Sequence, residues 1–406
     1  MKLLALGHPF LFAYNQRKFV AMKRLSPKLR LRLIVPRRGR ERFESTECEV
    51  HPELNREEIV PLGVWPAGWH MTHLHNPARV GAIFREFQPD VIHVDPGEPQ
   101  ALLTVEAIIL QRIFAPHAAV TLFTVDNLLR RRRFPLGMVK NRLRAYSLPR
   151  VAAMVCCNQR AAELLAVERR FTGPAVLLPQ FGFDVSEHTP GRESRLRSEL
   201  GLQGVPVIGY AGRWVEQKGL RLLFEALLSL QHFPWKLLLV GSGPLEEEIR
   251  ERWMRQLPGR IVLVPAVPHQ QVARYLRCAD IFALASYATT SWAEQFGLVL
   301  PQAMMLGIPC VGSSSGAIPE VIGPGGVCFA EGNTLALARA LESLLSSPER
   351  REQLGGEGRR FALEHYTDEK VAEKYLQFFE RARQNATEQS GFGSAAELQS
   401  ISPPRR

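Results

Sequence analysis

The chain of 406 residues is too long for one hydrophobic core, so its length predicts two domains. Hydrophobic residues make up 46% and charged residues 22%, as in soluble globular proteins, and the lack of about 18 consecutive uncharged apolar residues excludes a membrane-spanning helix. The net charge of +11 lies in residues 1–180, where 27 Lys and Arg face 15 Asp and Glu; this suits an anionic membrane surface or acceptor, while no motif typical of nucleic-acid-binding modules is present.

Short apolar runs alternate with helical patterns along the first half of the chain. The runs are KLLALG (2–7), LRLIVP (31–36), DVIHVD (90–95), AVTLFT (119–124), AAMVCC (152–157) and AVLLPQ (175–180). Apolar runs separated by helices indicate a parallel sheet that is covered on both faces. The first run therefore reads as a buried strand closing at Gly7 rather than as a signal peptide.

A basic run, RRRRFPLGMVKNRLRAYSLPR, follows at 130–150 and mixes Arg and Lys with apolar side chains. An amphipathic segment of this kind can lie on an anionic lipid surface, which would suit a lipid-linked acceptor. A solvated helix edge or a mobile loop explains the same composition. Both interpretations stay open.

The pattern of apolar runs starts again in the second half. Its members are VPVIGYAG (205–212), WKLLLVG (235–241), RIVLVPA (260–266), IFALAS (281–286) and IPCVGS (308–313). Two series of this kind fit two doubly wound α/β domains in tandem better than one very wide sheet.

The polar, turn-rich stretch 185–201 is the predicted linker between an N-terminal domain at 1–184 and a C-terminal domain at 202–366. A final helix is expected over 367–386, with Thr367 as its N-cap, and it could return to the N-terminal domain. The polar end, 387–406, is expected to be a disordered tail.

Ligands of open α/β sheets bind beyond the carboxyl ends of the strands, so polar groups in the loops at those ends are candidate ligand contacts. The strand ending at Gly212 is followed by Arg213 and Lys218. Two cations beside a glycine turn suit a diphosphate, although an exposed basic loop has the same sequence.

The next strand ends in VGSGP at 240–244. Its Gly241 would allow a ligand to approach the backbone closely. A tight turn explains this weak motif equally well.

The segment SWAEQFGLVLPQAMMLGIPCV at 291–311 is more specific. Glu294 precedes a loop of Gln295, Phe296, Gly297 and Leu298, and a helix is predicted to follow. The free N–H groups of 295–298 and the Glu294 carboxylate would face a hydroxyl-rich or anionic ligand. At 3.6 residues per turn, Gln302 is predicted to lie on the same side as Glu294 and to hold two vicinal hydroxyls. The structural alternative is a capped amphipathic helix in which Glu294 has no role in ligand binding.

Residues 203–380 resemble the retaining family-4 (group 1) glycosyltransferases, which have the GT-B fold. The resemblance rests on GYAGRWVEQKG, LLLVGSGPLEEEI, CADIFALAS and EQFGLVLPQAMMLGIPCVGSSSGAIPEVIG, and the first half joins it weakly through PDVIHVD and LPQFGFD. It implies an α/β protein with two Rossmann-like doubly wound domains facing across a cleft. The N-terminal domain would bind the acceptor and the C-terminal domain a nucleotide-diphosphate-sugar donor.

The resemblance also implies roles for the residues picked out above. Arg213 and Lys218 would hold the diphosphate and, with Glu294, act in catalysis. The sugar nucleotide would be held by the remaining residues: Gly212, Gly241, Gln295, Phe296, Gly297, Leu298 and Gln302. Neither a metal nor a cofactor besides the donor is expected. The reaction would transfer a sugar, with retention, to a glycan, lipid-linked or small-molecule acceptor in polysaccharide or glycoconjugate biosynthesis.

Three positions depart from the family pattern. Gln302 replaces a second glutamate, which keeps one acceptor oxygen but loses a charge-assisted hydrogen bond of about 1–2 kcal/mol. Only Gly7 stands where many relatives have two glycines. Asp126 and Asn127 stand where relatives often have a histidine, and His93 or His117 could replace it, although a structural role is more common for such histidines.

These departures keep alternatives open. A degenerate sugar-nucleotide-binding subunit that assists a partner enzyme is the main one; an epimerase or phosphorylase on the same architecture lacks its own signature. Six cysteines, including the adjacent Cys156 and Cys157, fit no disulfide framework or zinc site. Reduced thiols predict a cytoplasmic protein, with peripheral membrane contact as an option.

Overall fold

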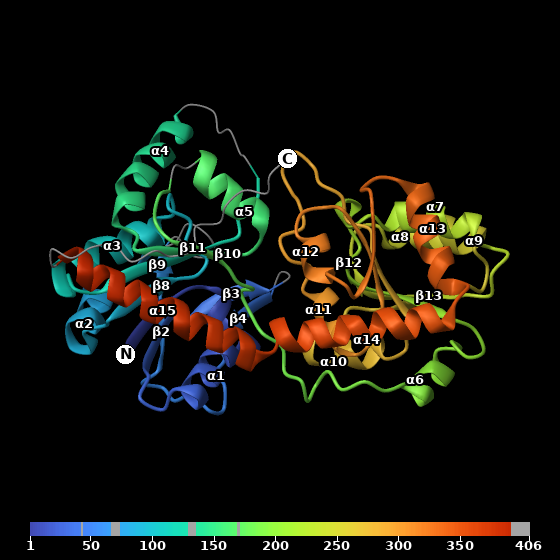
Figure 1. Ribbon diagram of the computed structural model, residues 1–406, viewed down its shortest axis with the longest axis horizontal. Coiled ribbons are helices and arrows are strands. Elements are labelled where there is room, and N and C mark those ends of the chain that lie inside the picture. The colour runs from blue at the N-terminus through green and yellow to red at the C-terminus, as the bar shows by residue number, and fades with distance from the viewer. Residues whose placement is uncertain (42–43, 66–73, 129–134, 169–170, 391–406) are drawn as a thin grey trace. The chain divides into compact units, whose positions relative to one another are not determined.

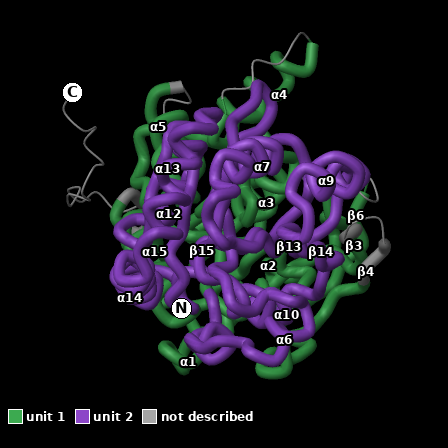
Figure 2. Tube along the Cα trace, turned by 90° about the vertical axis from the view of Figure 1, so that its right-hand side faces the viewer, with its two compact units in different colours: residues 1–182, 368–406 green, residues 183–367 purple. Residues whose placement is uncertain are grey.

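The computed structural model describes residues 1–41, 44–65, 74–128, 135–168 and 171–390. The chain divides into two compact units, coloured separately in Figure 2. Unit 1 comprises residues 1–182 and 368–406, and unit 2 comprises residues 183–367. Each unit has its own hydrophobic core.

Unit 1 contains a parallel sheet in the order β11-β10-β9-β8-β1-β2-β5. Its strands are β1 (Lys2–Leu6), β2 (Arg30–Pro36), β5 (Ile59–Leu62), β8 (Val91–Val94), β9 (Ala119–Thr124), β10 (Ala153–Cys156) and β11 (Ala175–Leu177). Two short antiparallel pairs accompany the sheet: β3 (Arg38–Glu41) with β4 (Glu44–Glu47), and β6 (Val64–Trp65) with β7 (Leu74–His75). The six predicted runs all form strands, because fully apolar runs satisfy a sheet that is buried on both faces.

Helices of unit 1 connect these strands, and the last helix of the chain joins them (Figure 1). They are α1 (Arg17–Leu25), α2 (Pro77–Phe87), α3 (Leu102–Phe114), α4 (Leu136–Ser147), α5 (Gln159–Glu163) and α15 (Asp368–Ser390). Helix α15 packs against α1 and places Val371, Tyr375 and Phe379 in the core of unit 1. It begins directly after Thr367 and extends to Ser390, beyond the predicted end at 386.

Unit 2 contains a second parallel sheet in the order β14-β13-β12-β15-β16-β17, with helices on both faces (Figure 1). Its strands are β12 (Val207–Arg213), β13 (Lys236–Ser242), β14 (Ile261–Val264), β15 (Ile281–Leu284), β16 (Cys310–Ser313) and β17 (Gly326–Phe329). Its helices are α6 (Ser194–Glu199), α7 (Leu220–Ser229), α8 (Glu246–Glu248), α9 (Met254–Gln256), α10 (His269–Leu276), α11 (Val299–Met305), α12 (Ile318–Ile322), α13 (Thr334–Leu345) and α14 (Pro348–His365). All five predicted runs are strands, and β17 is an additional one.

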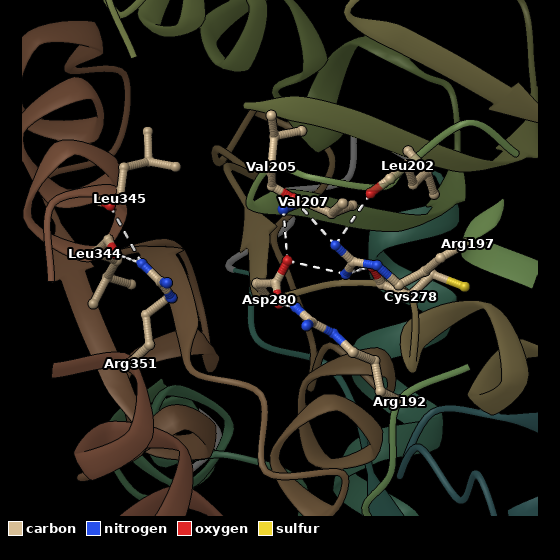
Figure 3. A network of polar contacts seen from close by, with 10 residues as sticks. All are labelled: Arg192, Arg197, Leu202, Val205, Val207, Cys278, Asp280, Leu344, Leu345 and Arg351. Atoms are coloured by element: carbon tan, nitrogen blue, oxygen red, sulfur yellow. Dashed lines mark hydrogen bonds and ion pairs between the residues drawn. The ribbon is translucent and has the colours of Figure 1, made fainter. Parts of the chain in front are cut away.

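The stretch predicted as a linker, 185–201, is part of unit 2 and contains α6. Figure 3 shows the reason: the Arg197 guanidinium lies inside a network of polar contacts. Arg197 donates to the carbonyls of Leu202, Val205 and Cys278 and forms an ion pair with Asp280. Because these partners lie shortly before β12 and β15, the network attaches α6 to the sheet.

The chain crosses from unit 1 to unit 2 near residue 182 and returns near 368. Within unit 2, Phe183 forms a β-bridge with Thr367. Within unit 1, Gly182 lies against Asp368, where an added Cβ would come within 2.5 Å of the Asp368 Cα. The predicted linker 185–201 therefore lies after the first crossing point, inside unit 2. Its polar composition did not reveal that Arg197 is buried.

A buried ion pair lies in unit 1 at the end of β8. Lys18 Nζ is 2.8 Å from Asp95 Oδ2, and neither side chain is exposed. Gln180 donates to Asp95, and Lys18 donates to the Gln180 carbonyl. Burial lowers the pKa of Lys18, while Asp95 opposes that shift. The neighbouring His93 is also fully buried, and burial followed by the charge of Lys18 lowers its pKa well below 6.5.

Two sequence predictions reach residues that the structure does not describe. The basic run at 130–150 is described from residue 135 onward, as α4 and a short turn, and 130–134 lie outside. Of the predicted tail, 391–406 lie outside the described residues. Within the described part, no helix combines the length and the apolarity needed to cross a bilayer.

Candidate active site in unit 2

Lys218 and Glu294, which were predicted separately, form an ion pair in unit 2. Lys218 ends a short 3₁₀ turn after β12, and Glu294 lies in the loop between β15 and α11. Strands β12 and β15 are neighbours, so their carboxyl ends bring the two segments together. Lys218 Nζ is 2.6 Å from Glu294 Oε2, and its charge lies 5.0 Å from the centre of the Trp292 ring. The pair is mostly enclosed, with side-chain exposures of 16% and 8%.

Two further segments fix Glu294. The hydroxyl of Ser286, two residues after the end of β15, donates to the same carboxylate oxygen at 3.0 Å. The Glu294 carbonyl accepts from the Ala317 N–H. A Cβ on Gly316 would lie 2.0 Å from that carbonyl, so only glycine permits this approach. Glu294 is therefore held at both its backbone and its side chain.

Arg213 lies at the carboxyl end of β12 with an exposed side chain. Its carbonyl accepts from the Tyr210 hydroxyl at 2.7 Å, which fixes the backbone at this point. Among the residues that the structure describes, its guanidinium forms no ion pair or hydrogen bond. Burial, followed by the charge of Glu294, raises the pKa of Tyr210, so this hydroxyl stays neutral. The positive charge of Arg213 is therefore available to an anionic ligand.

Gly212 and Gly241 face each other across β12 and β13. Both have positive φ angles, 151° and 152°. A Cβ on Gly241 would lie 1.9 Å from the Gly212 carbonyl oxygen. The close approach of the strand ends therefore requires glycine at position 241, and Gly212 has a φ angle that other residues rarely adopt. The two glycines leave backbone rather than side chains beside Arg213.

In the loop Gln295–Leu298, the side chains of Gln295 and Leu298 are exposed and that of Phe296 is half-buried. Phe296 packs on the core of unit 2 and meets Tyr366 edge to face, so its ring is structural. Gly297 has φ of 75°, and Leu298 is exposed just before α11. In the described part of the chain, the N–H groups of Phe296, Gly297 and Leu298 donate no hydrogen bond, whereas the prediction covered the N–H groups of all four residues, 295–298.

The spacing argument that placed Gln302 on the same side as Glu294 does not apply in the structure. The prediction treated Glu294 and Gln302 as two turns of one element, but residues 294–298 are not helical and α11 begins at Val299. Gln302 is buried, 1% exposed, and its amide Nε2 lies 3.5 Å from His269 Nε2 at the start of α10. Its Oε1 has no partner among the described residues. Glu294 and Gln302 therefore have separate partners.

The first-half candidates have mixed outcomes. Asp126 and Asn127 follow β9 at the carboxyl edge of the sheet in unit 1. His93 is buried inside β8, where its Nδ1 contacts the Thr121 hydroxyl, and this supports the structural reading. His117 is exposed in the turn before β9, at the opposite edge. The single Gly7 packs against the Asp95 backbone.

Sequence reasoning missed Ser286, Trp292, His269 and Gly316, which contact the predicted residues. The position of Ser286 at the end of an apolar run was the only available signal, because its partner lies in another loop. Within the described residues, no group of three or more His, Cys, Asp or Glu is placed to hold a metal ion.

Comparison with protein families gives a match over most of unit 2. Residues 193–361 match the family described as glycosyl transferases group 1. Spore coat protein SA of Bacillus subtilis is 28% identical over 221 residues, which cover 50% of this chain and 58% of that protein. A GDP-mannose-dependent phosphatidylinositol monomannoside mannosyltransferase of Corynebacterium glutamicum is 30% identical over 187 residues, 44% of this chain and 49% of that protein. The chain thus spans about half the length of these relatives.

Solved structures extend the likeness to nearly the whole chain. HepE of Anabaena, solved in complex with UDP, has a TM-score of 0.71 at 16% identity and covers 94% of this chain and 100% of its own. Sucrose-phosphate synthase of Thermosynechococcus elongatus has a TM-score of 0.69 at 18% identity, with 94% and 98% covered. These likenesses confirm the predicted GT-B fold of two Rossmann-like domains. In sequence, residues 193–361 of this chain are similar to the group 1 glycosyl transferases.

Proposed function

We propose that the protein is a retaining glycosyltransferase that moves a sugar from a nucleotide-diphosphate-sugar donor to a glycan, lipid-linked or small-molecule acceptor. Unit 2 binds the donor, with Arg213 and Lys218 on the diphosphate and Glu294 on the sugar. Unit 1 supplies the acceptor-binding surface. Polysaccharide or glycolipid synthesis is the setting, since a teichuronic acid biosynthesis glycosyltransferase of Bacillus subtilis is also a relative, 32% identical over 175 residues.

One observation carries this proposal. The carboxyl edge of the sheet in unit 2 carries three features: the Lys218–Glu294 ion pair, the backbone of Gly212 and Gly241, and Arg213. Among the described residues, the Arg213 side chain has no partner. The carboxyl edge is where ligands of doubly wound sheets bind. Cations suit the phosphates, a carboxylate accepts hydrogen bonds from sugar hydroxyls, and the glycines leave room for the nucleotide.

The proposed step breaks the bond between the anomeric carbon and the diphosphate oxygen. The acceptor hydroxyl oxygen bonds to that carbon on the same face, and its proton leaves with the nucleoside diphosphate. Negative charge grows on the β-phosphate as the bond breaks, and Arg213 and Lys218 stabilise it from fixed positions. Glu294 orients the sugar so that the reacting carbon faces the acceptor.

Binding and transfer test the proposal in sequence. A thermal-shift screen across nucleoside diphosphates and their sugar conjugates identifies the base and the sugar, because a ligand at 100 times its Kd stabilises by about 2.7 kcal/mol. Transfer is then measured with that donor and a panel of acceptors, and proton NMR of the product reads the anomeric configuration. Absence of binding by every nucleoside diphosphate would refute the proposal, and an inverted product would refute retention.

The same assay tests independence from metal ions. We propose that Arg213 and Lys218 neutralise the diphosphate without a divalent cation. Activity after treatment with EDTA should equal that of the untreated enzyme. Loss of activity that returns with magnesium or manganese would assign that charge to a metal instead.

A degenerate sugar-nucleotide-binding subunit is the second candidate, and the observation that favours it is Gln302. An amide beside His269 replaces a carboxylate, so the nucleotide is bound with one charge less. Such a subunit would bind the sugar nucleotide without hydrolysing or transferring it. Turnover by the purified chain separates the two candidates.

We further propose that unit 1 touches an anionic membrane surface, which would place the enzyme peripherally on the cytoplasmic face. On α4, Leu136, Met138 and Val139 are exposed next to the exposed Arg142. Apolar side chains flanked by cations suit a lipid–water interface. Sedimentation with phosphatidylglycerol vesicles but not with phosphatidylcholine vesicles is expected, and a Leu136→Ser, Val139→Ser variant should stay in solution. If the same fraction of the protein sedimented with both kinds of vesicle, a solvated helix edge would be favoured.

A further inference from the structure

Lys218 stands between two partners. The proposed function gives it to the diphosphate, whereas the structure pairs it with Glu294 at 2.6 Å. Both side chains are mostly enclosed, so water weakens this pair less than it weakens a surface ion pair. A phosphate that reaches Lys218 must therefore compete with the Glu294 carboxylate for the same ammonium group.

We propose that the donor exchanges this ion pair: the β-phosphate takes Lys218 from Glu294, and Ser286 keeps the Glu294 carboxylate in place for the sugar hydroxyls. Ser286 is then a positioning residue for the transfer reaction. The inference rests on the proposed function and adds to it a link between the phosphate subsite and the sugar subsite.

The chemistry of lysine suits this exchange. Its ammonium group is a compact charge with three donors on a flexible stem, so it can turn from a carboxylate to a phosphate oxygen without moving the backbone. The Trp292 ring, 5.0 Å from Nζ, remains a favourable neighbour of the cation during this movement. Arg213, which has no protein partner among the described residues, can meet the diphosphate first.

Ser286 is built to hold the carboxylate after Lys218 leaves. It is fully buried, and its hydroxyl lies 3.0 Å from the oxygen that Lys218 contacts. Its carbonyl accepts a hydrogen bond from the Ser313 hydroxyl of β16, which restrains its backbone. One hydrogen bond to Glu294 therefore does not depend on the position of Lys218.

The exchange has an unusual consequence for affinity. For a bare nucleoside diphosphate, Glu294 is only a competitor, because no sugar is present to use the released carboxylate. For the sugar nucleotide, the carboxylate is a competitor for Lys218 and also a partner of the sugar. Removal of its charge should therefore strengthen binding of the first ligand and weaken binding of the second.

Isothermal titration tests this with the nucleoside diphosphate and sugar nucleotide found by the screen. Glu294→Gln should bind the bare diphosphate about three- to tenfold tighter than wild type and should bind the sugar nucleotide less tightly. Glu246→Gln, which removes an exposed acid in the same unit, should change neither Kd. Equal or weaker binding of the diphosphate by Glu294→Gln would overturn the exchange while the proposed function stands.

Ser286→Ala provides the second test. It should leave the Kd of the nucleoside diphosphate unchanged and raise the KM of the sugar nucleotide, and Ser286→Thr, which keeps a hydroxyl, should restore that KM. A parallel loss of affinity for both ligands would assign Ser286 a merely structural role and overturn its place in the proposal. If wild type binds no nucleoside diphosphate, the proposed function itself fails.

Discussion

The two units contain the same kind of ion pair in two different settings. In unit 1, Lys18 and Asp95 are 2.8 Å apart and fully buried, with the Tyr375 ring 4.5 Å from the ammonium and three phenylalanine rings within 6 Å. In unit 2, Lys218 and Glu294 are mostly enclosed, with side-chain exposures of 16% and 8%, and the Trp292 ring lies beside Lys218. Both acids follow a strand at the carboxyl edge of their sheet.

The difference shows how surroundings decide the role of a charged pair. Asp95 is fully buried, and both of its carboxylate oxygens already accept hydrogen bonds, from Lys18 and from Gln180. Lys218 and Glu294 lie beside an uncommitted arginine and beside glycine backbone. We therefore assign the first pair a role in stability, and we propose a role in donor binding for the second. Four experiments can break or sharpen this distinction.

The largest effect is expected from Asp95→Ala. It leaves the Lys18 ammonium buried without its partner, and loss of one member of a buried pair costs about 3–5 kcal/mol. Urea denaturation followed by circular dichroism should show this loss. Arg24→Ala, which removes an exposed ion pair with Glu53 from the same helix α1, should cost less than about 1 kcal/mol. Similar losses for the two variants would contradict the structural role of Asp95.

Lys218→Ala should act on the reaction instead. Loss of a fixed group that stabilises developing charge lowers the rate by about 10²–10³-fold. The free energy of unfolding should change by much less than in Asp95→Ala, because Lys218 is partly exposed. Steady-state transfer kinetics and denaturation of the same preparation check both parts. Arg250→Ala, a surface cation in the same unit, is the control; full activity in Lys218→Ala would remove the diphosphate assignment.

Gly241→Ala should damage the donor site through the backbone. Its Cβ would clash with the Gly212 carbonyl, and a side chain at positive φ adds strain of about 1–3 kcal/mol. The midpoint temperature of thermal unfolding and the affinity for the nucleotide should both decrease. Gly259→Ala is the matched control, because Gly259 also has positive φ but has open space around it. If Gly241→Ala and Gly259→Ala lowered stability equally, the close contact between the ends of β12 and β13 would not be the cause of the loss.

The smallest effect concerns pH. The pKa of His93 is lowered by burial and by Lys18, so the unfolded chain binds a proton below pH 6.5 that the folded chain does not. Stability from this group is therefore complete above pH 6.5 and falls as the pH decreases, by up to about 1.4 kcal/mol per pH unit. Denaturation between pH 7 and pH 5 should show a shallower dependence for His93→Gln than for wild type. If the free energy of unfolding depended on pH equally in His93→Gln and wild type, His93 would not contribute to the pH dependence of stability.

Local sequence determined the strands and the loops that carry the candidate site. Every apolar run that was predicted as a strand is one, because a parallel sheet buried on both faces demands continuous apolar side chains. Arg213, Lys218 and Glu294 could be selected because each follows such a run at the edge where ligands bind. The prediction of a linker at 185–201 was wrong, because buried Arg197 binds the Cys278 carbonyl and the Asp280 carboxylate, which lie 81 and 83 positions along the chain.

Tertiary structure alone decided which side chains meet. Lys218 and Glu294 are 76 positions apart, and Lys18 and Asp95 are 77 apart. No local pattern relates such residues; the strand order places β12 beside β15 and β1 beside β8, and this order brings their loops together. The same order gives Gln302 a histidine neighbour and gives Glu294 its serine. Spacing along the chain predicts contacts only within one regular element, and the site is built from several.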